Sequence, residues 1–238
     1  MKKILFVILI TVVLFISCNK SKEETPYICA ACTKTPQALA ANNSSSKGIY
    51  KGVFFGSTGT ISFDIQNNSA AVTATLILDG VTVSFSSGTL PQTGQPYTAT
   101  FAGTINGQPA SINFSVGTDG SSPVITAASI PGHPNTGFGL LKETSSGLVE
   151  SFEGTWKESS STNGGTLNMV VSRTANSWNV VKGDSGNPPQ YFNGSISGNN
   201  LICNCPLGLS IIGTFSGDQA DGQYNSTNNG TWTIRRTL

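Results

Sequence analysis

The stretch "YTATFAGTINGQPASINFSV", residues 97–116, decides the fold of this chain. Asn106-Gly107 at its centre is typical of the two-residue type I′ turn that joins antiparallel strands. With that turn, apolar residues share one side of the hairpin, in the pairs Tyr97 with Val116, Ala99 with Phe114, Phe101 with Ile112 and Gly103 with Ala110. Threonine, serine and asparagine line the other side. Because a one-residue slip would turn one apolar set outward, this register predicts a sheet with one packed face.

A second hairpin repeats the pattern in "TATLILDGVTVSF", residues 73–85. With Asp79-Gly80 as the turn, the facing apolar pairs are Leu78 with Val81, Leu76 with Val83 and Ala74 with Phe85. About eight strand-sized segments lie in residues 48–142 and about eight more follow, all separated by turn residues. Short strands at this spacing predict an all-β protein, mostly an antiparallel meander closed into one or two β-barrels.

Turn and linker residues near position 147 divide the chain into two candidate halves or domains, residues 48–147 and 148–238. The halves carry a faint echo: "YKGVF" from Tyr50 is similar to "FEGTW" from Phe152, and "GTISF" from Gly59 is similar to "GTLNM" from Gly165. An old duplication and convergent strand composition both explain this echo.

Residues 1–17 have the pattern of a secretory signal, with two lysines before an apolar core. That core, residues 4–16, is shorter than the roughly 20 residues that a membrane-spanning helix needs. Cys18 follows directly. An uncleaved signal anchor and a secreted chain without lipid are the alternatives.

Ser17-Cys18 resembles the lipobox of bacterial lipoproteins. The resemblance implies that the Cys18 thiol takes a diacylglycerol and becomes the mature N-terminus, and two or three acyl chains are a sufficient anchor. Lys22, Glu23 and Glu24 resemble the export signal of Bacteroidetes-type surface lipoproteins, although a solvated tether explains them equally well. We therefore expect a lipid-anchored outer-membrane protein, at the cell surface or otherwise on the periplasmic face, with residues 18–47 as a flexible tether.

The low charge of the chain limits its partners. Charged residues make up 11% of the sequence and the formal net charge is +1, which gives no electrostatic basis for binding nucleic acid. The outward positions of the hairpins are polar, which argues against a lipid-embedded porin-like barrel. The expected partners are the membrane, through the lipid, and an unknown small molecule or protein.

Two G-x-W motifs, Gly154-Thr155-Trp156 and Gly230-Thr231-Trp232, resemble that of lipocalins. The second half is also similar to avidin-type meanders and to the barrels of transferrin-binding-type surface lipoproteins. These resemblances imply a closed barrel with its loops or interior as the binding surface, and Arg235 or Arg236 covering a tryptophan at one end. Three tryptophans are candidate ligand-lining residues: Trp156, Trp178 and Trp232.

Four cysteines follow Cys18, and disulfides are the default in an exported protein. Cys203 and Cys205 alternate on one expected strand face, where Cα atoms about 6.6 Å apart would disfavour a bridge between them. We expect cross-bridges from Cys29 and Cys32 to this strand. A local Cys29–Cys32 bridge with buried thiols is the alternative, ahead of a redox C-x-x-C or a zinc site. We predict no metal and no cofactor.

The sequence shows no recognisable catalytic set. His133 is the single histidine, no nucleophile motif accompanies it, and most acids lie at turns or linkers. We predict a non-catalytic binding or interaction module rather than an enzyme. A structural envelope or adhesion component is the alternative, and an unrecognised hydrolase comes third.

Overall fold

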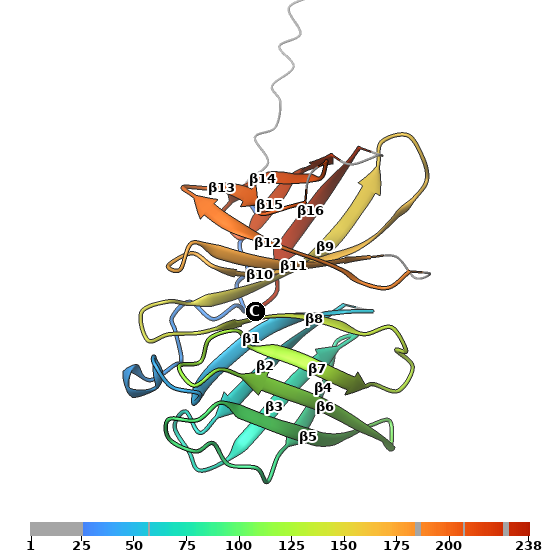
Figure 1. Ribbon diagram of the computed structural model, residues 1–238. Helices are drawn as coiled ribbons and strands as arrows, with labels where there is room; N and C mark the ends of the chain where they lie inside the picture. Colours follow the sequence, from blue (N-terminus) through green and yellow to red (C-terminus); the bar gives the residue numbers. More distant parts are fainter. Residues whose placement is uncertain (1–25, 57, 184–186, 207, 226–228) are drawn as a thin grey trace, which may run out of the picture.

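The computed structural model describes residues 26–56, 58–183, 187–206, 208–225 and 229–238. The expected leader (1–17), Cys18, Lys22, Glu23 and Glu24 lie outside the described residues. Within the described ranges the chain forms sixteen strands in two eight-stranded antiparallel meanders (Figure 1). The described residues contain no helix long and apolar enough to cross a membrane. The all-β prediction is confirmed, with two barrels rather than one.

The first meander covers residues 48–142. Its strands are β1 (Gly48–Phe55), β2 (Gly59–Ile65), β3 (Val72–Leu78), β4 (Val81–Ser86), β5 (Tyr97–Ile105), β6 (Gln108–Val116), β7 (Val124–Ser129) and β8 (Gly137–Lys142). Their sheet order runs from β7 through β1 to β8, so the barrel is nearly closed with a seam between β7 and β8. Both predicted hairpin registers are confirmed, residue for residue. Positive φ angles at both residues of Asp79-Gly80 and Asn106-Gly107 match the predicted turns.

The second meander is a closed barrel. Its strands are β9 (Val149–Glu158), β10 (Gly164–Ser172), β11 (Ser177–Gly183), β12 (Gln190–Ser197), β13 (Asn200–Cys203), β14 (Ser210–Ser216), β15 (Gln219–Asn225) and β16 (Gly230–Arg236). β16 closes the barrel by pairing with β9. Closure leaves no free strand edge in this barrel.

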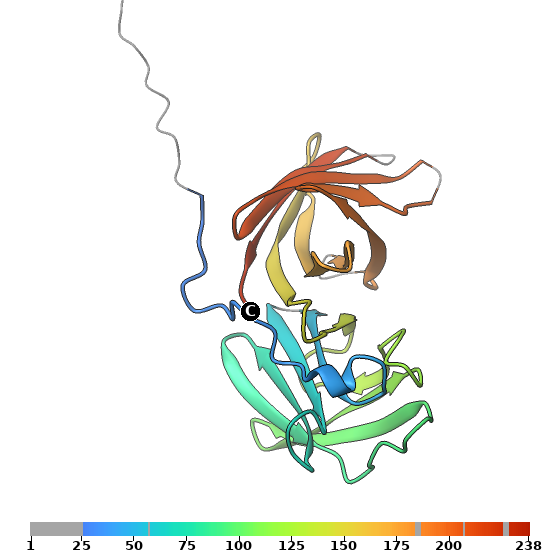
Figure 2. The same ribbon diagram turned by 90° about the vertical axis from the view of Figure 1, so that its left-hand side faces the viewer.

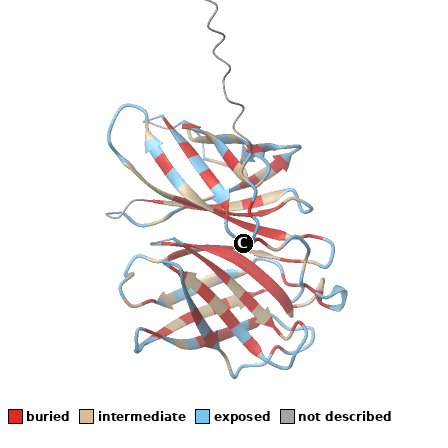
Figure 3. Ribbon diagram, turned by 180° about the vertical axis from the view of Figure 1, so that it is seen from behind, coloured by how far each residue is buried: buried red, intermediate tan, exposed pale blue. Residues whose placement is uncertain are grey.

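The barrels stack through β1 and β8 of the first and β9, β10 and β11 of the second (Figure 1). β1 is buried along its whole length, because one face fills the first barrel while the other meets the second barrel (Figure 3). The buried residues of this junction are mostly β-branched and aromatic: Val53, Phe55, Val149, Val170 and Val181. Amide and hydroxyl side chains of the second barrel also bind backbone carbonyls of the first; Asn168 Nδ2 lies 2.6 Å from the oxygen of Phe54, and Asn179 Nδ2 lies 2.9 Å from that of Leu140. The junction is therefore packed and hydrogen-bonded.

A buried ion pair lies at the same junction. Lys51 Nζ is 2.7 Å from Glu143 Oε2, and both side chains are almost completely buried. Glu143 also accepts the backbone N–H of Val149, at 3.1 Å, and that of Gln37, at 2.6 Å. One carboxylate thus joins the first barrel, the second barrel and the N-terminal segment.

The N-terminal segment differs from the expected flexible tether over its described part, residues 26–47. It runs beside both barrels, as the blue trace in Figure 2 shows, and includes a short 3₁₀ turn, η2 (Ala40–Asn42). Asn42 donates to the backbone oxygen of Asn67, and Lys142 donates to the backbone oxygens of Asn42 and Ser45. Buried polar contacts of this kind fix a segment whose composition alone predicts mobility.

The echo between the halves extends to strand pairing. Tyr50 pairs with Phe63 on one side and Lys142 on the other. Phe152, in the matching position, pairs with Met169 and Arg236. Strand composition does not by itself fix register at two neighbouring strands, so these equivalent pairings support an internal duplication.

Candidate functional site

Two of the three candidate tryptophans fill the second barrel. Trp178 and Trp232 are buried, and their indole N–H groups donate to backbone oxygens of Ser195 and Gln223. Each ring lies against glycine backbone: a Cβ on Gly194 would come within 2.4 Å of Trp178, and one on Gly213 within 2.2 Å of Trp232. Rings packed in this way contribute to the core, and their role as ligand-lining residues stays a prediction.

Trp156 has different surroundings, near the end of β9. Its ring meets that of Tyr224 edge-on, with centroids 5.7 Å apart and an interplanar angle of 82°. The ammonium of Lys182 lies 3.6 Å from the Trp156 centroid and 4.8 Å from that of Tyr224. We name these two rings the aromatic corner. Lys182 follows Trp178 and Val180 at two-residue spacing on β11, so it shares their inward-facing side.

Glycines separate the aromatic corner from the junction between the barrels. Trp156 Nε1 donates to the backbone oxygen of Gly183, at 3.0 Å. On the other side of this backbone lies Phe55 from β1, whose ring would be 2.4 Å from a Cβ on Gly183. A Cβ on Gly165, across the ladder, would lie 2.0 Å from the same oxygen. Only a wall without side chains fits between the two aromatic rings.

A cleft of about 420 Å³ opens beside this wall, between the two barrels. Its lining combines an aromatic floor, five glycines and a few polar side chains: Phe55, Gly56, Gly132, His133, Pro134, Asn135, Gly164, Gly165, Thr166 and Gly183. The volume falls in the range typical of small-molecule sites, which also favour domain junctions. We name this site the inter-barrel cleft.

His133 is held in one orientation at the rim of the inter-barrel cleft. Its ring packs edge-on against Phe54, with centroids 5.5 Å apart, and Nδ1 lies 3.2 Å from the backbone oxygen of Gly56. Nε2 lies 3.9 Å from a carboxylate oxygen of Asp79. The single histidine of the chain therefore lines the inter-barrel cleft.

A second hollow, of about 470 Å³, lies on the outer wall of β15, β16 and β9. Its floor is a grid of exposed polar side chains in register, with Asp221 beside Thr233 and Gln223 beside Thr231. Trp156 and Trp232 also border this hollow, but their side chains are buried in the core of the second barrel. This hollow has less capacity to orient a ligand than the inter-barrel cleft.

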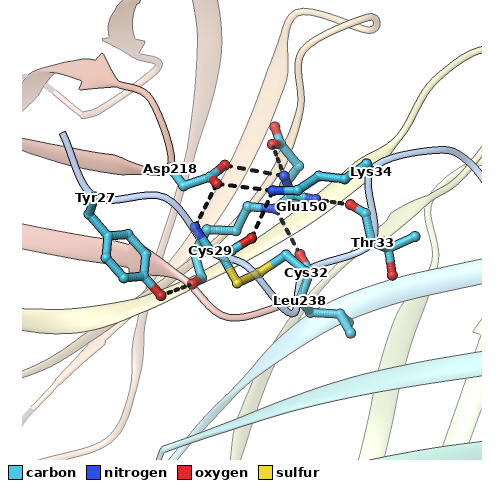
Figure 4. The surroundings of a disulfide bond; sticks show 9 residues. Tyr27, Cys29, Cys32, Thr33, Lys34, Glu150, Asp218 and Leu238 are labelled. Carbon is cyan, nitrogen blue, oxygen red and sulfur yellow. Dashed lines mark hydrogen bonds and ion pairs between the residues drawn. A yellow bond between two sulfur atoms is a disulfide. The ribbon is translucent and has the colours of Figure 1, made fainter.

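Asp218 fastens the N-terminal segment to the second barrel, at the end away from the inter-barrel cleft. Figure 4 shows its contacts. Its carboxylate accepts the Cys29 N–H at 2.8 Å and lies 3.3 Å from Lys34 Nζ and 3.2 Å from Arg236 Nη1. Burial opposes ionisation of Asp218, but these three donors outweigh it and hold the pKa of the carboxyl below its ordinary value. Arg236 also pairs with Glu150, at 3.0 Å. We name this group the N-terminal clamp.

The disulfides correct one prediction. Cys29 pairs with Cys32 and Cys203 with Cys205, so the expected cross-bridges between the N-terminal segment and the strand are wrong. β13 ends at Cys203, and the chain no longer continues in extended form. The Cys203 and Cys205 Cα atoms are consequently 5.1 Å apart, less than the spacing expected within a strand. The local Cys29–Cys32 bridge agrees with the alternative prediction, but the buried thiols of that alternative are wrong, because Cys203 and Cys205 are bridged to each other.

The lipocalin-like detail of an arginine over the G-x-W tryptophan is also wrong for Trp156. Arg236 is in register with Phe152, four residues before Trp156 and toward the other end of β9. Arg235 instead stacks on Tyr27, with its guanidinium 5.2 Å from the ring centroid. In the first barrel, Lys142 of the last strand lies over the ring of Tyr50 from the first strand, with Nζ 5.7 Å from the centroid.

Comparison with known proteins gives no relative. No protein-family model, no curated protein and no solved structure matches the chain. Among the described residues, no group of three or more histidine, cysteine, aspartate or glutamate side chains is placed to hold a metal ion.

Three residues that shape these sites were not predicted from the sequence: Phe55, Lys182 and Tyr224. For Lys182 a signal exists, because period-two alternation on β11 places it on the inward face with Trp178. Nothing in the sequence indicates that Phe55 meets Gly183, because that contact depends on how the two barrels stack.

Proposed function

We propose that this protein is a lipid-anchored outer-membrane lipoprotein that acts as a non-catalytic binding module, with the inter-barrel cleft as its binding site. The observation that carries the proposal is the cleft itself. It joins about 420 Å³ of space to an aromatic floor and to fixed polar groups. Small-ligand sites combine an apolar surface with a few oriented polar groups in this way.

The lining indicates the kind of ligand. Phe55 and Pro134 provide apolar surface, whereas His133, Asn135 and Thr166 provide hydrogen-bonding side chains. Glycine walls allow a ligand to approach the backbone closely. A compact molecule with one apolar face and several polar substituents fits this chemistry.

The proposed anchor rests on the sequence around Cys18. The described chain begins beside the N-terminal clamp, where the oxygen of Tyr27 accepts the N–H of Asp218. Eight residues reach at most about 28 Å, at roughly 3.5 Å each, so a lipid on Cys18 would hold the clamp end near the membrane. The inter-barrel cleft lies at the other end of β10, beside Gly164, and would face away from it.

The single histidine makes the cleft testable by NMR. We expect pooled small molecules from the cell envelope to shift the imidazole resonances of His133 in the purified protein. Thr166→Trp, which fills the cleft, should abolish the shift, whereas Thr231→Trp on the outer wall should not. Unchanged His133 resonances in the parent protein, or equal shifts in the Thr166→Trp variant, would remove the cleft as the site.

The anchor requires its own experiment. Labelled palmitate should enter the parent protein and not a Cys18→Ser variant, and protease added to whole cells should degrade the protein if it lies at the cell surface. A mature N-terminal peptide that does not begin with acylated Cys18 would contradict the anchor.

A structural envelope component is the second candidate, and the packing of Trp178 and Trp232 favours it. In that case the protein would bind no small molecule, and its deletion would change envelope integrity. A strain with Thr166→Trp should keep its envelope integrity, because this substitution changes only the inter-barrel cleft.

A further inference from the structure

The aromatic corner inside the second barrel already holds a positive charge. The Lys182 ammonium lies within cation–π distance of both Trp156 and Tyr224, over the face of the indole. Such an arrangement stabilises a cation, most strongly at tryptophan. The two rings stand nearly perpendicular, so they form two walls around one cation position.

The negative potential of the corner has a further source in Glu158. Glu158 follows Trp156 by two residues on β9, and its charge adds to burial in raising the pKa of the Tyr224 phenol. The carboxylate is held by Ser161 Oγ, at 2.6 Å, and by Asn163 Nδ2, at 3.2 Å. Two ring faces with a carboxylate nearby are the components that select cations elsewhere in proteins.

The Tyr224 hydroxyl adds an independent observation. Tyr224 is 4% exposed, and its hydroxyl oxygen is buried without a hydrogen-bond partner among the described residues. A buried polar group without a hydrogen-bond partner destabilises the folded state. A ligand with a polar substituent next to its cationic group would provide that partner.

We propose that the aromatic corner of Trp156 and Tyr224 is a binding site for a small organic cation with a quaternary ammonium group, and that Lys182 occupies it in the unliganded protein. A lysine ammonium is compact and strongly hydrated, so it is poorly matched to two ring faces. A quaternary ammonium has no N–H groups to hydrate and is the ligand for which aromatic cages are best suited. This site is separate from the inter-barrel cleft, and the two proposals stand independently.

Lys182 is suited to exchange with such a ligand. It is only partly buried and has a flexible four-carbon stem on β11. Its tethered ammonium competes with a free cation at an effective concentration on the order of millimolar or more. This competition lowers the affinity of the parent protein for the organic cation, and removal of the Lys182 ammonium is expected to strengthen binding of that cation about tenfold or more.

The test is a titration of the full-length protein in detergent with tetramethylammonium chloride and with choline chloride. The readout is the indole N–H resonance of Trp156, against sodium chloride at equal ionic strength. We expect saturable shifts in the parent protein, tighter binding in Lys182→Ala, and unchanged binding in the matched control Lys157→Ala, an exposed lysine on the outer wall.

Each other result overturns the proposal. Absence of a saturable shift in both the parent and Lys182→Ala would exclude a cation site. Binding to Lys182→Ala alone would show that the corner serves only to pack the native lysine. Equal shifts with sodium chloride would show an ionic-strength effect without binding.

Discussion

Removal of one partner of the Lys51–Glu143 ion pair should destabilise both barrels. The two side chains are 2% and 0% exposed, and they meet at 2.7 Å. Breaking a buried pair from one side typically costs about 3–5 kcal/mol, because the remaining charge has no compensation. We expect losses of this size for Glu143→Gln and for Lys51→Met. Against a total stability of about 5–15 kcal/mol for a typical domain, either change is large.

The double variant separates the interaction between the two charges from the cost of leaving one of them buried and unpaired. In Lys51→Met with Glu143→Gln no buried charge remains, and the amide oxygen still accepts one of the two backbone N–H groups that Glu143 now binds. The double variant should therefore be less destabilised than the sum of the single variants, by about 2 kcal/mol.

Urea unfolding measures these losses, and the chain provides a reporter for each barrel. All three tryptophans lie in the second barrel, so their fluorescence follows that barrel, whereas far-ultraviolet circular dichroism follows both. The exposed Lys157→Met is the control and should change stability by less than about 0.5 kcal/mol. Single-variant losses below about 1 kcal/mol, or full additivity in the double variant, would refute the argument.

Three further changes test other parts of the structure. Asp218→Asn should free the N-terminal segment at neutral pH and speed its proteolysis. In the parent protein, the lowered pKa of Asp218 stabilises the clamp fully above about pH 4, and this stabilisation is lost on further acidification. A cleavage rate of the parent protein that does not depend on pH would contradict the clamp. Glu153→Gln should stabilise the protein by about 1 kcal/mol at pH 8 but not at pH 4. Burial raises the pKa of the Glu153 carboxyl, so the stability that the protonated carboxyl contributes is lost as pH rises through the folded-state pKa. Equal urea midpoints of the parent and the variant at pH 8 would contradict this. Gly183→Ala should cost about 1–3 kcal/mol in urea unfolding through its clash with the Phe55 ring, and Phe55→Leu should recover part of that loss; no recovery would mean that the clash lies elsewhere.

The registers of the two hairpins could be predicted because residues close together in the sequence determine them. Turn dipeptides fix which residues face one another, and alternating polarity fixes the buried side. Pro109 shows that the hairpin register also accommodates a residue without a backbone N–H. It pairs with Thr104, and β6 meets β7 only from Ser111 onward, so no ladder hydrogen bond is lost at the proline.

The contacts between the barrels could not be predicted, because they depend on pairs far apart in the sequence. Lys51 in "YKGVF" has the appearance of a solvated strand residue, and only Glu143, ninety-two residues later, explains its burial. The disulfide error has a similar cause. Cys203 lies in the strand, paired with Gly194, but β13 ends at that residue and Cys205 lies beyond the extended chain that the alternation pattern assumes.

The N-terminal clamp has a mechanical consequence if the chain is tethered through Cys18. A pull on the tether would reach residues 27–34 first, where charge-assisted hydrogen bonds to Asp218 and Arg236 resist it. Rupture of these bonds, followed by those around Asn42, would free some twenty residues before tension reached β1, with a contour length of about 70 Å at roughly 3.5 Å per residue. Shear at the cell envelope would then be absorbed by a reversible extension, while both barrels kept their shape.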